Sequence, residues 1–197
     1  MKQVYFDNAA TTPIRPQVID CITQSLQEHY ANCSSTYGIG RAAKAKLEYA
    51  RKNIAKLLGV DAAEVVFTSG GTEANNLILQ SLVKDVKVTH IVSSKIEHHA
   101  VLKTIESLQA QYPIQVSYVD ILPNGQVDIH HLEEILEHNT HQNTAVSLMH
   151  INNEIGTILN IEQVARLCKT YSAYFHSDTV QSIGTVSYTH LTLPTIA

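Results

Sequence analysis

A glycine-rich turn is the first group of residues whose types could do chemistry. The sequence SGGTE, residues 69–73, stands between a β-prone run and a helical run. Glycines let a backbone approach an anion closely, and the first turn of a helix offers unpaired N–H groups and a partial positive charge. The Thr72 hydroxyl can add a donor beside Gly71. The turn is therefore a candidate phosphate cradle, although it follows neither common nucleotide-binding pattern and many such turns bind nothing.

An aspartate near the end of the chain is the second candidate. The sequence HSDTVQ, residues 176–181, follows the last β-prone run. An aspartate that faces a pyridinium nitrogen keeps that nitrogen protonated, which makes pyridoxal phosphate an electron sink. Asp178 could take this role, and Gln181, one helical turn further on, could donate to the phenolic oxygen of the ring. In isolation, an aspartate at this place could equally cap a helix.

Three further clusters carry polar or small residues at the ends of expected elements. The first, EHHAV at 97–101, offers an imidazole that can stack on a flat ring and titrate near neutral pH. The second, MHINNEIG at 149–156, has the composition of a polar site loop. The third, YFDNAATTP at 5–13, is an extended segment able to approach a ligand. An ordinary surface histidine, an Asn-rich turn and a plain loop remain the alternatives.

Short apolar runs alternate along the chain with stretches of helical spacing, and together they must position these clusters. The alternation predicts an α/β fold with a mostly parallel sheet and helices on both of its faces. Ligands of such sheets bind beyond the carboxyl ends of the strands, where four of the clusters lie. The β-prone runs are 64–69, 90–93, 114–119, 144–149 and 173–176, and the helical stretches are 16–30, 42–58, 76–83, 99–111, 129–138 and 161–171.

Composition excludes several classes of protein. The 197 residues are 44% hydrophobic and carry a net charge of −4, which gives no electrostatic reason to bind nucleic acid or an anionic membrane. No apolar run approaches the roughly 20 residues of a membrane span, and the N-terminus has no signal-peptide pattern, so we expect a cytoplasmic protein. The three cysteines form no CxxC pair and the adjacent histidines no zinc motif, so we expect reduced thiols and no metal site.

Taken in this order, the five clusters resemble the cysteine desulfurases. This family belongs to the class-V aminotransferase-like branch of the fold-type-I pyridoxal-phosphate enzymes. The resemblance runs from Val4 to Gly184, and the Glu-His-x-Ala-Val and Asn-Asn-Glu-Ile-Gly blocks are its most specific parts. It implies that the chain forms part of a fold-type-I large domain.

The resemblance also implies a role for individual residues. It places the cofactor phosphate on Gly71 and Thr72 and the cofactor ring under His98, which would also assist proton transfer as the catalytic residue. It pairs Asp178 with the pyridine nitrogen and Gln181 with the phenolic oxygen. The remaining implied positions are Asn153, beside the ring and the substrate, and Ala10 and Thr11, which would approach the substrate.

The family reaction converts L-cysteine to L-alanine and leaves the sulfur on an enzyme cysteine as a persulfide. The resemblance therefore implies a sulfur-acceptor partner, either a scaffold of iron–sulfur cluster biogenesis or a tRNA-thiolation enzyme, and a homodimer for the intact protein. Two alternatives remain open. One is another enzyme of the same branch, such as a selenocysteine lyase, and the other is a non-catalytic module that binds pyridoxal phosphate or another phosphate.

The sequence departs from the family pattern in ways that limit the expected activity. Lys169 is the last lysine, whereas the family's cofactor-bearing lysine lies some two dozen residues after the block at 178–181. The region of the persulfide cysteine is also absent, and Cys33 stands in a family Asn-Pro-x-Ser block that has lost its proline. We therefore expect an N-terminal fragment that is inactive as written.

The domain organisation follows from this comparison. We expect an N-terminal segment at 1–15, a truncated large domain at 16–185 and a non-native tail at 186–197. The tail, VSYTHLTLPTIA, has no charge and no helical period, and it resembles the translation of a sequencing adapter. We therefore do not expect the tail to be part of the fold.

Overall fold

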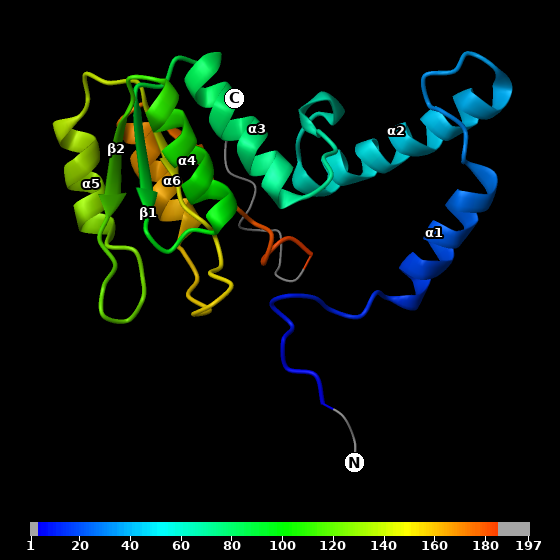
Figure 1. Ribbon diagram of the computed structural model, residues 1–197, viewed down its shortest axis with the longest axis horizontal. Helices are drawn as coiled ribbons and strands as arrows, with labels where there is room; N and C mark the ends of the chain where they lie inside the picture. The colour runs from blue at the N-terminus through cyan, green and yellow to red at the C-terminus, as the bar shows by residue number, and fades with distance from the viewer. Residues whose placement is uncertain (1–3, 185–197) are drawn as a thin grey trace. The chain divides into compact units, whose positions relative to one another are not determined.

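The computed structural model describes residues 4–184, so the expected tail at 186–197 lies outside the described residues (Figure 1). The chain divides into two units, Met1–Val66 and Phe67–Ala197. None of the described helices is both long enough and apolar enough to cross a membrane.

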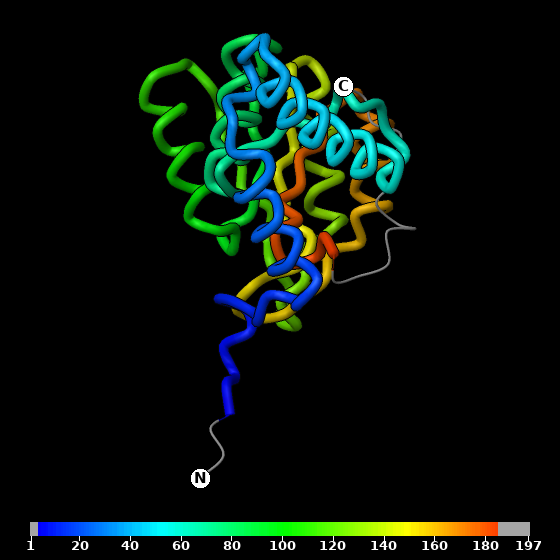
Figure 2. Tube along the Cα trace, turned by 90° about the vertical axis from the view of Figure 1, so that its right-hand side faces the viewer, coloured from blue at the N-terminus to red at the C-terminus, as the bar shows by residue number. Residues whose placement is uncertain are grey.

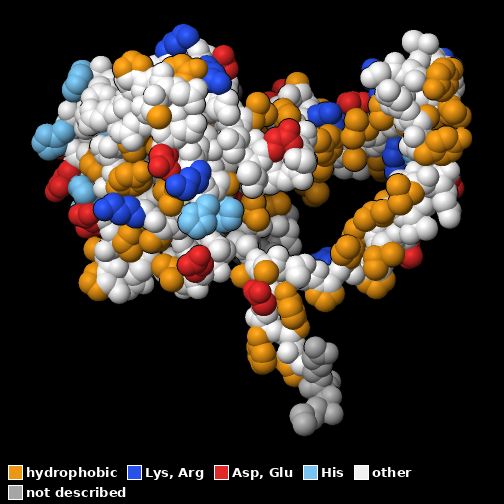
Figure 3. Space-filling view, in the orientation of Figure 1, with side chains coloured by type: hydrophobic (Ala, Val, Ile, Leu, Met, Phe, Trp, Pro, Cys, Tyr) orange, Lys and Arg blue, Asp and Glu red, His pale blue; other side chains and the backbone are white. Residues whose placement is uncertain are grey.

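The first unit consists mainly of two helices that the sequence predicted. Helix α1 (Pro16–Glu28) begins with a proline in its first turn, where the missing N–H costs no hydrogen bond. Helix α2 (Gly38–Leu58) ends at Gly59, whose left-handed φ of 70° favours glycine. A short 3₁₀ turn, η1 (Ala62–Glu64), follows. The apolar side chains of α1 remain exposed, as the hydrophobic surface along it shows in Figure 3, and they are Val18, Ile19, Ile22 and Leu26.

The second unit is built around a four-stranded sheet in the order β2-β1-β3-β4. Every pair of neighbouring strands is parallel, which confirms the predicted α/β architecture. The strands are β1 (His90–Ser94), β2 (Gln115–Val119), β3 (Thr144–Ser147) and β4 (Tyr174–His176). The helices are α3 (Gly71–Lys84), α4 (His99–Gln111), α5 (Ile129–His138) and α6 (Ile161–Thr170).

Helices cover both faces of this sheet, because successive side chains of a strand point to opposite sides. Ile91 and Ala145 pack with the apolar faces of α3 and α4. Their neighbours Val92 and Val146 pack with α5 and α6 instead. Figures 1 and 2 show α4 and α6 on opposite sides of the strands. The two packed layers fix the carboxyl edge of the sheet, where the candidate site lies.

One β-prone run does not form a strand. Residues 65–68 are extended but belong to no ladder, and the side chains of Val66 and Phe67 are exposed. A strand needs a hydrogen-bonded neighbour, and no strand among residues 4–184 pairs with this run. The expectation of a strand at 64–69 is therefore wrong for this structure, and the reason is the missing partner rather than the local sequence.

Candidate active site

The glycine-rich turn forms the N-terminus of α3. Gly70 is the N-cap, with an extended backbone, and the helix begins at Gly71. The Glu73 carboxylate turns back and accepts from both the backbone N and the Oγ of Ser69, each at 2.6 Å, and these hydrogen bonds lower the pKa of Glu73. The first N–H groups of a helix have no intrahelical acceptor. The turn therefore has the local structure expected of an anion cradle.

Gly71 lies directly against the chain that follows β4. A Cβ atom built on Gly71 would stand 2.6 Å from Cγ2 of Val180, far inside van der Waals contact. Glycine is therefore required here for the close approach of two segments rather than for an unusual backbone angle. The approach places the start of α3 beside the segment that carries Asp178.

Asp178 is bound on both of its carboxylate oxygens. The Nδ2 of Asn75 donates to Oδ2 at 2.7 Å, and the backbone N of Val180 donates to Oδ1 at 3.0 Å. Asn75 is only 4% exposed and lies one turn after Gly71 on α3. This hydrogen bond connects α3, whose first turn is the candidate phosphate cradle, to Asp178, the carboxylate expected to bind the ring nitrogen.

Sequence reasoning missed Asn75, although a signal was present. The buried residues of α3 are Asn75, Leu79, Leu82 and Val83, which follow one helical stripe. An amide at the start of an otherwise apolar stripe must find a polar partner inside the protein, because an unpaired buried amide is costly. The stripe indicates a buried partner but does not identify it as Asp178.

His98 is the N-cap of α4, and its ring is exposed. The Nδ1 atom accepts a hydrogen bond of 3.1 Å from the backbone N of Ala100. Since Nδ1 acts as an acceptor, the neutral ring carries its proton on Nε2. The capping bond thus fixes the tautomer and leaves the Nε2–H directed away from the helix start, free to meet a ligand.

The loop after β3 is held in shape by Asn152. Its Nδ2 donates to the carbonyl of Ile96 at 2.8 Å, and its Oδ1 accepts from the backbone N of Glu154 and of Ile155. Its neighbour Asn153 is half-buried and lines a cavity of about 300 Å³ together with His98. Asn152 is therefore a structural residue of the loop, whereas Asn153 is available to a ligand.

His98 also borders a second cavity, of about 630 Å³, between α3 and α4. Thr72 lines this cavity from the start of α3. His98 thus lines one cavity with Thr72 and another with Asn153. Gly71, Asp178 and Gln181 line neither cavity, so a common site for all the predicted residues stays a prediction.

The last three predicted residues lie near the ends of the described chain. Gln181 is half-buried in the turn after β4 and follows Asp178 by three residues. Ala10 and Thr11 belong to the first unit, where both are exposed and their backbone N–H groups donate to the carbonyl of Asp7. Their predicted approach to the substrate stays a prediction.

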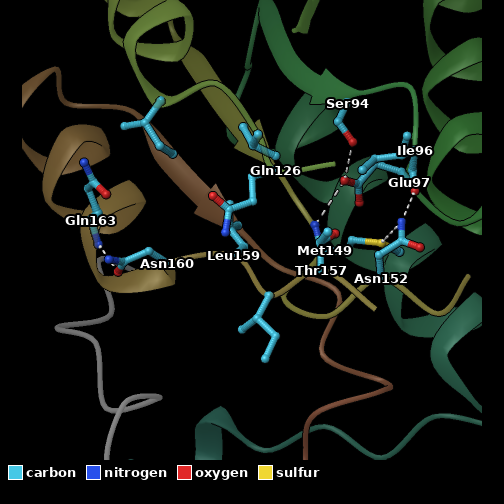
Figure 4. A pocket seen from close by; sticks show the side chains of 13 residues that line it. Ser94, Ile96, Glu97, Gln126, Met149, Asn152, Thr157, Leu159, Asn160 and Gln163 are labelled. Carbon is cyan, nitrogen blue, oxygen red and sulfur yellow. Dashed lines mark hydrogen bonds between the residues drawn. The ribbon is translucent and has the colours of Figure 1, made fainter. Parts of the chain in front are cut away.

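Glu97 was part of a predicted cluster but was given no role of its own. Glu97 is 6% exposed, and its Oε1 accepts from Ser94 Oγ at 2.8 Å and from the backbone N of Met149 at 3.1 Å (Figure 4). Burial raises the pKa of Glu97 to about 7, and the charge of Asp178 raises it as well, against the effect of the two hydrogen bonds. The site therefore contains a buried acid that titrates near neutral pH.

The other buried titratable groups have structural surroundings. His176 Nδ1 lies 2.9 Å from Ser147 Oγ, and burial lowers its pKa to about 4. Burial raises the pKa of the Cys168 thiol to about 12. All three cysteines are free, and within residues 4–184 no three His, Cys, Asp or Glu side chains converge as metal ligands would.

An all-parallel sheet with a glycine-started helix and an acid at its carboxyl edge defines an α/β ligand-binding domain. The model of the family Aminotransferase class-V matches residues 4–189. The chain therefore belongs to the class-V aminotransferase family.

The chain is also similar to individual members of this family and to solved structures. The chain is 40% identical over 185 residues to the protein named Cysteine desulfurase IscS of Dictyoglomus turgidum, covering 93% of this chain and 46% of that protein. A solved structure named NifS-like protein superposes with a TM-score of 0.89 at 35% identity, covering 98% of this chain and 53% of that one. A structure of SspA in complex with cysteine superposes at 0.82 with 31% identity, covering 90% and 51%. The chain thus spans about half the length of these relatives.

Proposed function

We propose that the second unit binds pyridoxal phosphate and belongs to a cysteine desulfurase, which converts L-cysteine to L-alanine and passes the sulfur on as an enzyme persulfide. The hydrogen bond between Asn75 and Asp178 is the observation that carries this proposal. It joins the helix whose start can hold a phosphate to the acid that can hold a ring nitrogen. The names of the relatives, and the cysteine in the SspA structure, favour L-cysteine as the substrate.

The residues of the site fit this cofactor. The start of α3 would hold the phosphate through backbone N–H groups of Gly71 and Thr72 and the Thr72 hydroxyl, since a helix N-terminus favours an anion. The close contact of Gly71 with Val180 brings the cradle near Asp178. His98 would stack on the ring, Asp178 would bind its nitrogen and Gln181 its phenolic oxygen. When bound, pyridoxal phosphate supplies an electron sink for bonds to the substrate α-carbon.

The side chains of the chain itself supply orientation and proton transfer. The carboxylate of Asp178 favours a protonated ring nitrogen, because an opposite charge stabilises the cation. His98 lines the cavity that it shares with Asn153, and its Nε2 could give or take a proton there as the candidate catalytic residue. Asn153 offers an amide to the substrate, and we propose that Ala10 and Thr11 also approach it.

We propose that a polypeptide of this sequence does not catalyse the desulfurase reaction by itself. No lysine follows Lys169, so nothing after Asp178 can bind the cofactor covalently. We further propose that the intact enzyme is a cytoplasmic homodimer. It would deliver sulfur to an acceptor protein of iron–sulfur cluster assembly or tRNA thiolation.

Cofactor binding is tested by titrating the purified chain with pyridoxal phosphate and following the visible absorbance and mass of the complex. We expect reversible binding by the chain and weaker binding in Asp178→Asn. Asp20→Asn, which changes an exposed aspartate of α1 in the first unit, should bind as the original chain does. Equal affinity in all three proteins would contradict the proposal.

The reaction class is tested in a chimera. Residues 1–184 are joined to the remaining half of the Dictyoglomus turgidum relative, and alanine and sulfide are measured with L-cysteine. With excess dithiothreitol to reduce the persulfide to sulfide, we expect both products in equal amounts from the chimera, loss of both in its Asp178→Ala form, and neither from the chain alone. A cofactor-loaded chimera that releases no alanine from L-cysteine would reject the desulfurase assignment while leaving cofactor binding intact.

A further inference from the structure

The carboxyl group of Glu97 is bound on one side only. Both of its donors, the Ser94 hydroxyl and the Met149 N–H, bind Oε1. The Oε2 atom is buried and has no partner among the described residues. A buried carboxylate is stable when donors serve both oxygens, so this uneven arrangement is costly for the charged form. It suits a carboxylic acid whose proton lies on Oε2.

Glu97 also stands in a wall between two cavities. Ile96, Glu97 and Asn152 line both the cavity of about 300 Å³ that contains His98 and an inner cavity of about 270 Å³. The inner cavity, seen in Figure 4, is rich in groups that bind water. The polar residues that line it besides Glu97 are Ser94, Gln126, Asn152, Thr157, Asn160 and Gln163. A space of this size and polarity can hold ordered water.

We propose that Glu97 is a proton-holding residue of the site, which keeps its proton on Oε2 and passes it to water when it ionises. In this step the O–H bond of the carboxyl group breaks, the carboxylate keeps the electron pair, and the proton passes to the water. Asn152 and Ile96 line both cavities beside the group. Glu97 thus borders both the cavity that contains His98 and the polar cavity beside it.

The charges around Glu97 support this role. Asp178, at the end of β4, is the charged neighbour that acts on Glu97, and its negative charge opposes ionisation. Lys95, His98, His99 and Glu154 line the cavity of about 300 Å³ that Glu97 also borders. Among the described residues that line the inner cavity, Glu97 is the only titratable one. His150, next to Met149, has a pKa lowered by burial, so its ring adds no charge at neutral pH.

Cofactor binding should lower the pKa of Glu97, an expectation that rests on the proposed function. A cationic ring nitrogen bound to Asp178 offsets the negative charge that holds the proton on Glu97. The pKa of Glu97 then falls, so binding of the cofactor should release a proton from Glu97 to water. Because linkage is reciprocal, raising the pH through the pKa of Glu97 should strengthen cofactor binding.

The first test needs no cofactor. Infrared spectra of the full chain labelled with ¹³C-glutamate are recorded from about pH 5 to about pH 9, a range that spans the pKa of about 7. We expect the C=O band of one protonated glutamic acid to disappear with a midpoint near pH 7. Glu97→Gln should lack this band, whereas Glu73→Gln should keep it. A chain with no protonated glutamate above about pH 6 would overturn the proposal.

A second variant tests the proposal even if Glu97→Gln does not fold. Asp178→Asn removes the neighbouring charge and keeps Glu97, so the midpoint of the same band should move to lower pH. An unchanged midpoint would show that Asp178 does not act on Glu97. It would also contradict the expected coupling between cofactor binding and the ionisation of Glu97.

The second test measures the proton released on binding. Calorimetric titration with pyridoxal phosphate at about pH 6.5, in two buffers of different ionisation heat, counts the protons exchanged. We expect net release by the original chain and a smaller release by Glu97→Gln. The difference should be a fraction of one proton, because a group with a pKa of about 7 is already partly ionised at this pH. Equal release by both proteins would overturn the linkage. If neither protein binds the cofactor, the proposed function fails, while the infrared titration still decides whether Glu97 holds a proton.

Discussion

Asn75 and Asp178 lie 103 residues apart in the sequence and are joined by a side-chain hydrogen bond of 2.7 Å. The amide comes from the second turn of α3 and the carboxylate from the end of β4. The other Asp178 oxygen accepts the N–H of Val180, which itself touches Gly71. The start of α3 and the end of β4 therefore act as one unit, and disturbing either should affect the other.

Replacing Asn75 by leucine should weaken cofactor binding. Leucine has a similar size but cannot donate, so Oδ2 of Asp178 loses its buried donor; hydrogen bonds to charged groups contribute about 1.5–3 kcal/mol. We expect the Kd for pyridoxal phosphate, measured by absorbance titration, to rise at least roughly tenfold. Asn76→Leu is the matched control, because Asn76 donates only to the carbonyl of Thr72 in its own helix. Similar losses in both variants would count against a specific role for Asn75.

Replacing Gly71 by alanine should destabilise the chain because of one contact. Alanine normally favours a helix by about 1 kcal/mol over glycine, but here its Cβ would meet Val180 Cγ2 at 2.6 Å. Overpacking of this kind costs about 1–3 kcal/mol. We expect a lower urea midpoint for Gly71→Ala and recovery in the double variant with Val180→Ala. Gly38→Ala, which has open space around its Cβ, should cause no comparable loss. Failure of Val180→Ala to restore stability would show that the contact is not the cause.

Glu97 and His176 should give the stability of the chain two opposite dependences on pH. The folded pKa of His176 is lowered from 6.5 to about 4, so its contribution is present above pH 6.5 and is lost as the pH falls toward 4. The folded pKa of Glu97 is raised from 4.5 to about 7, so its contribution is present below pH 4.5 and is lost as the pH rises through 7. Each is on the order of 3 kcal/mol.

Single variants should separate these two contributions. Between about pH 4.5 and 6.5 the unfolding free energy of the original chain should change little, because the two dependences nearly cancel. Glu97→Gln should become more stable as the pH rises in this interval, and His176→Gln should become less stable. Urea unfolding at several pH values measures all three proteins. The same pH profile in the original chain and both variants would show that neither group titrates as described.

Replacing Asn152 by alanine should loosen the loop after β3. The substitution removes the side-chain bonds to Ile96, Glu154 and Ile155 and leaves these partly buried backbone groups without their partners. Each unsatisfied group costs about 1–3 kcal/mol, so we expect a loss of several kcal/mol at most and faster amide exchange in this loop. Asn153→Ala should leave exchange unchanged and affect only ligand binding. Equal exchange rates in Asn152→Ala and the original chain would refute this account of the loop.

Much of the fold was determined by the sequence alone, because its signals are local. Alternating apolar runs and helical stretches predicted the parallel sheet with helices on both faces, and the helix ending at Gly59 followed from one glycine. The predicted residues Gly71, Thr72, His98, Asn153 and Asp178 also lie at the carboxyl edge of the sheet. Turn chemistry and hydrophobic period depend on neighbouring residues, which the sequence shows directly.

Other features were decided only by the tertiary structure, since they depend on residues far apart in the chain. The run at 64–69 has the composition of a strand, but a strand also needs a partner to accept its hydrogen bonds. Asn75 became part of the site only because folding placed it against Asp178. Glu97 is an ordinary acid in the sequence, and its pKa near 7 arises from burial beside β3 and from the charge at the end of β4.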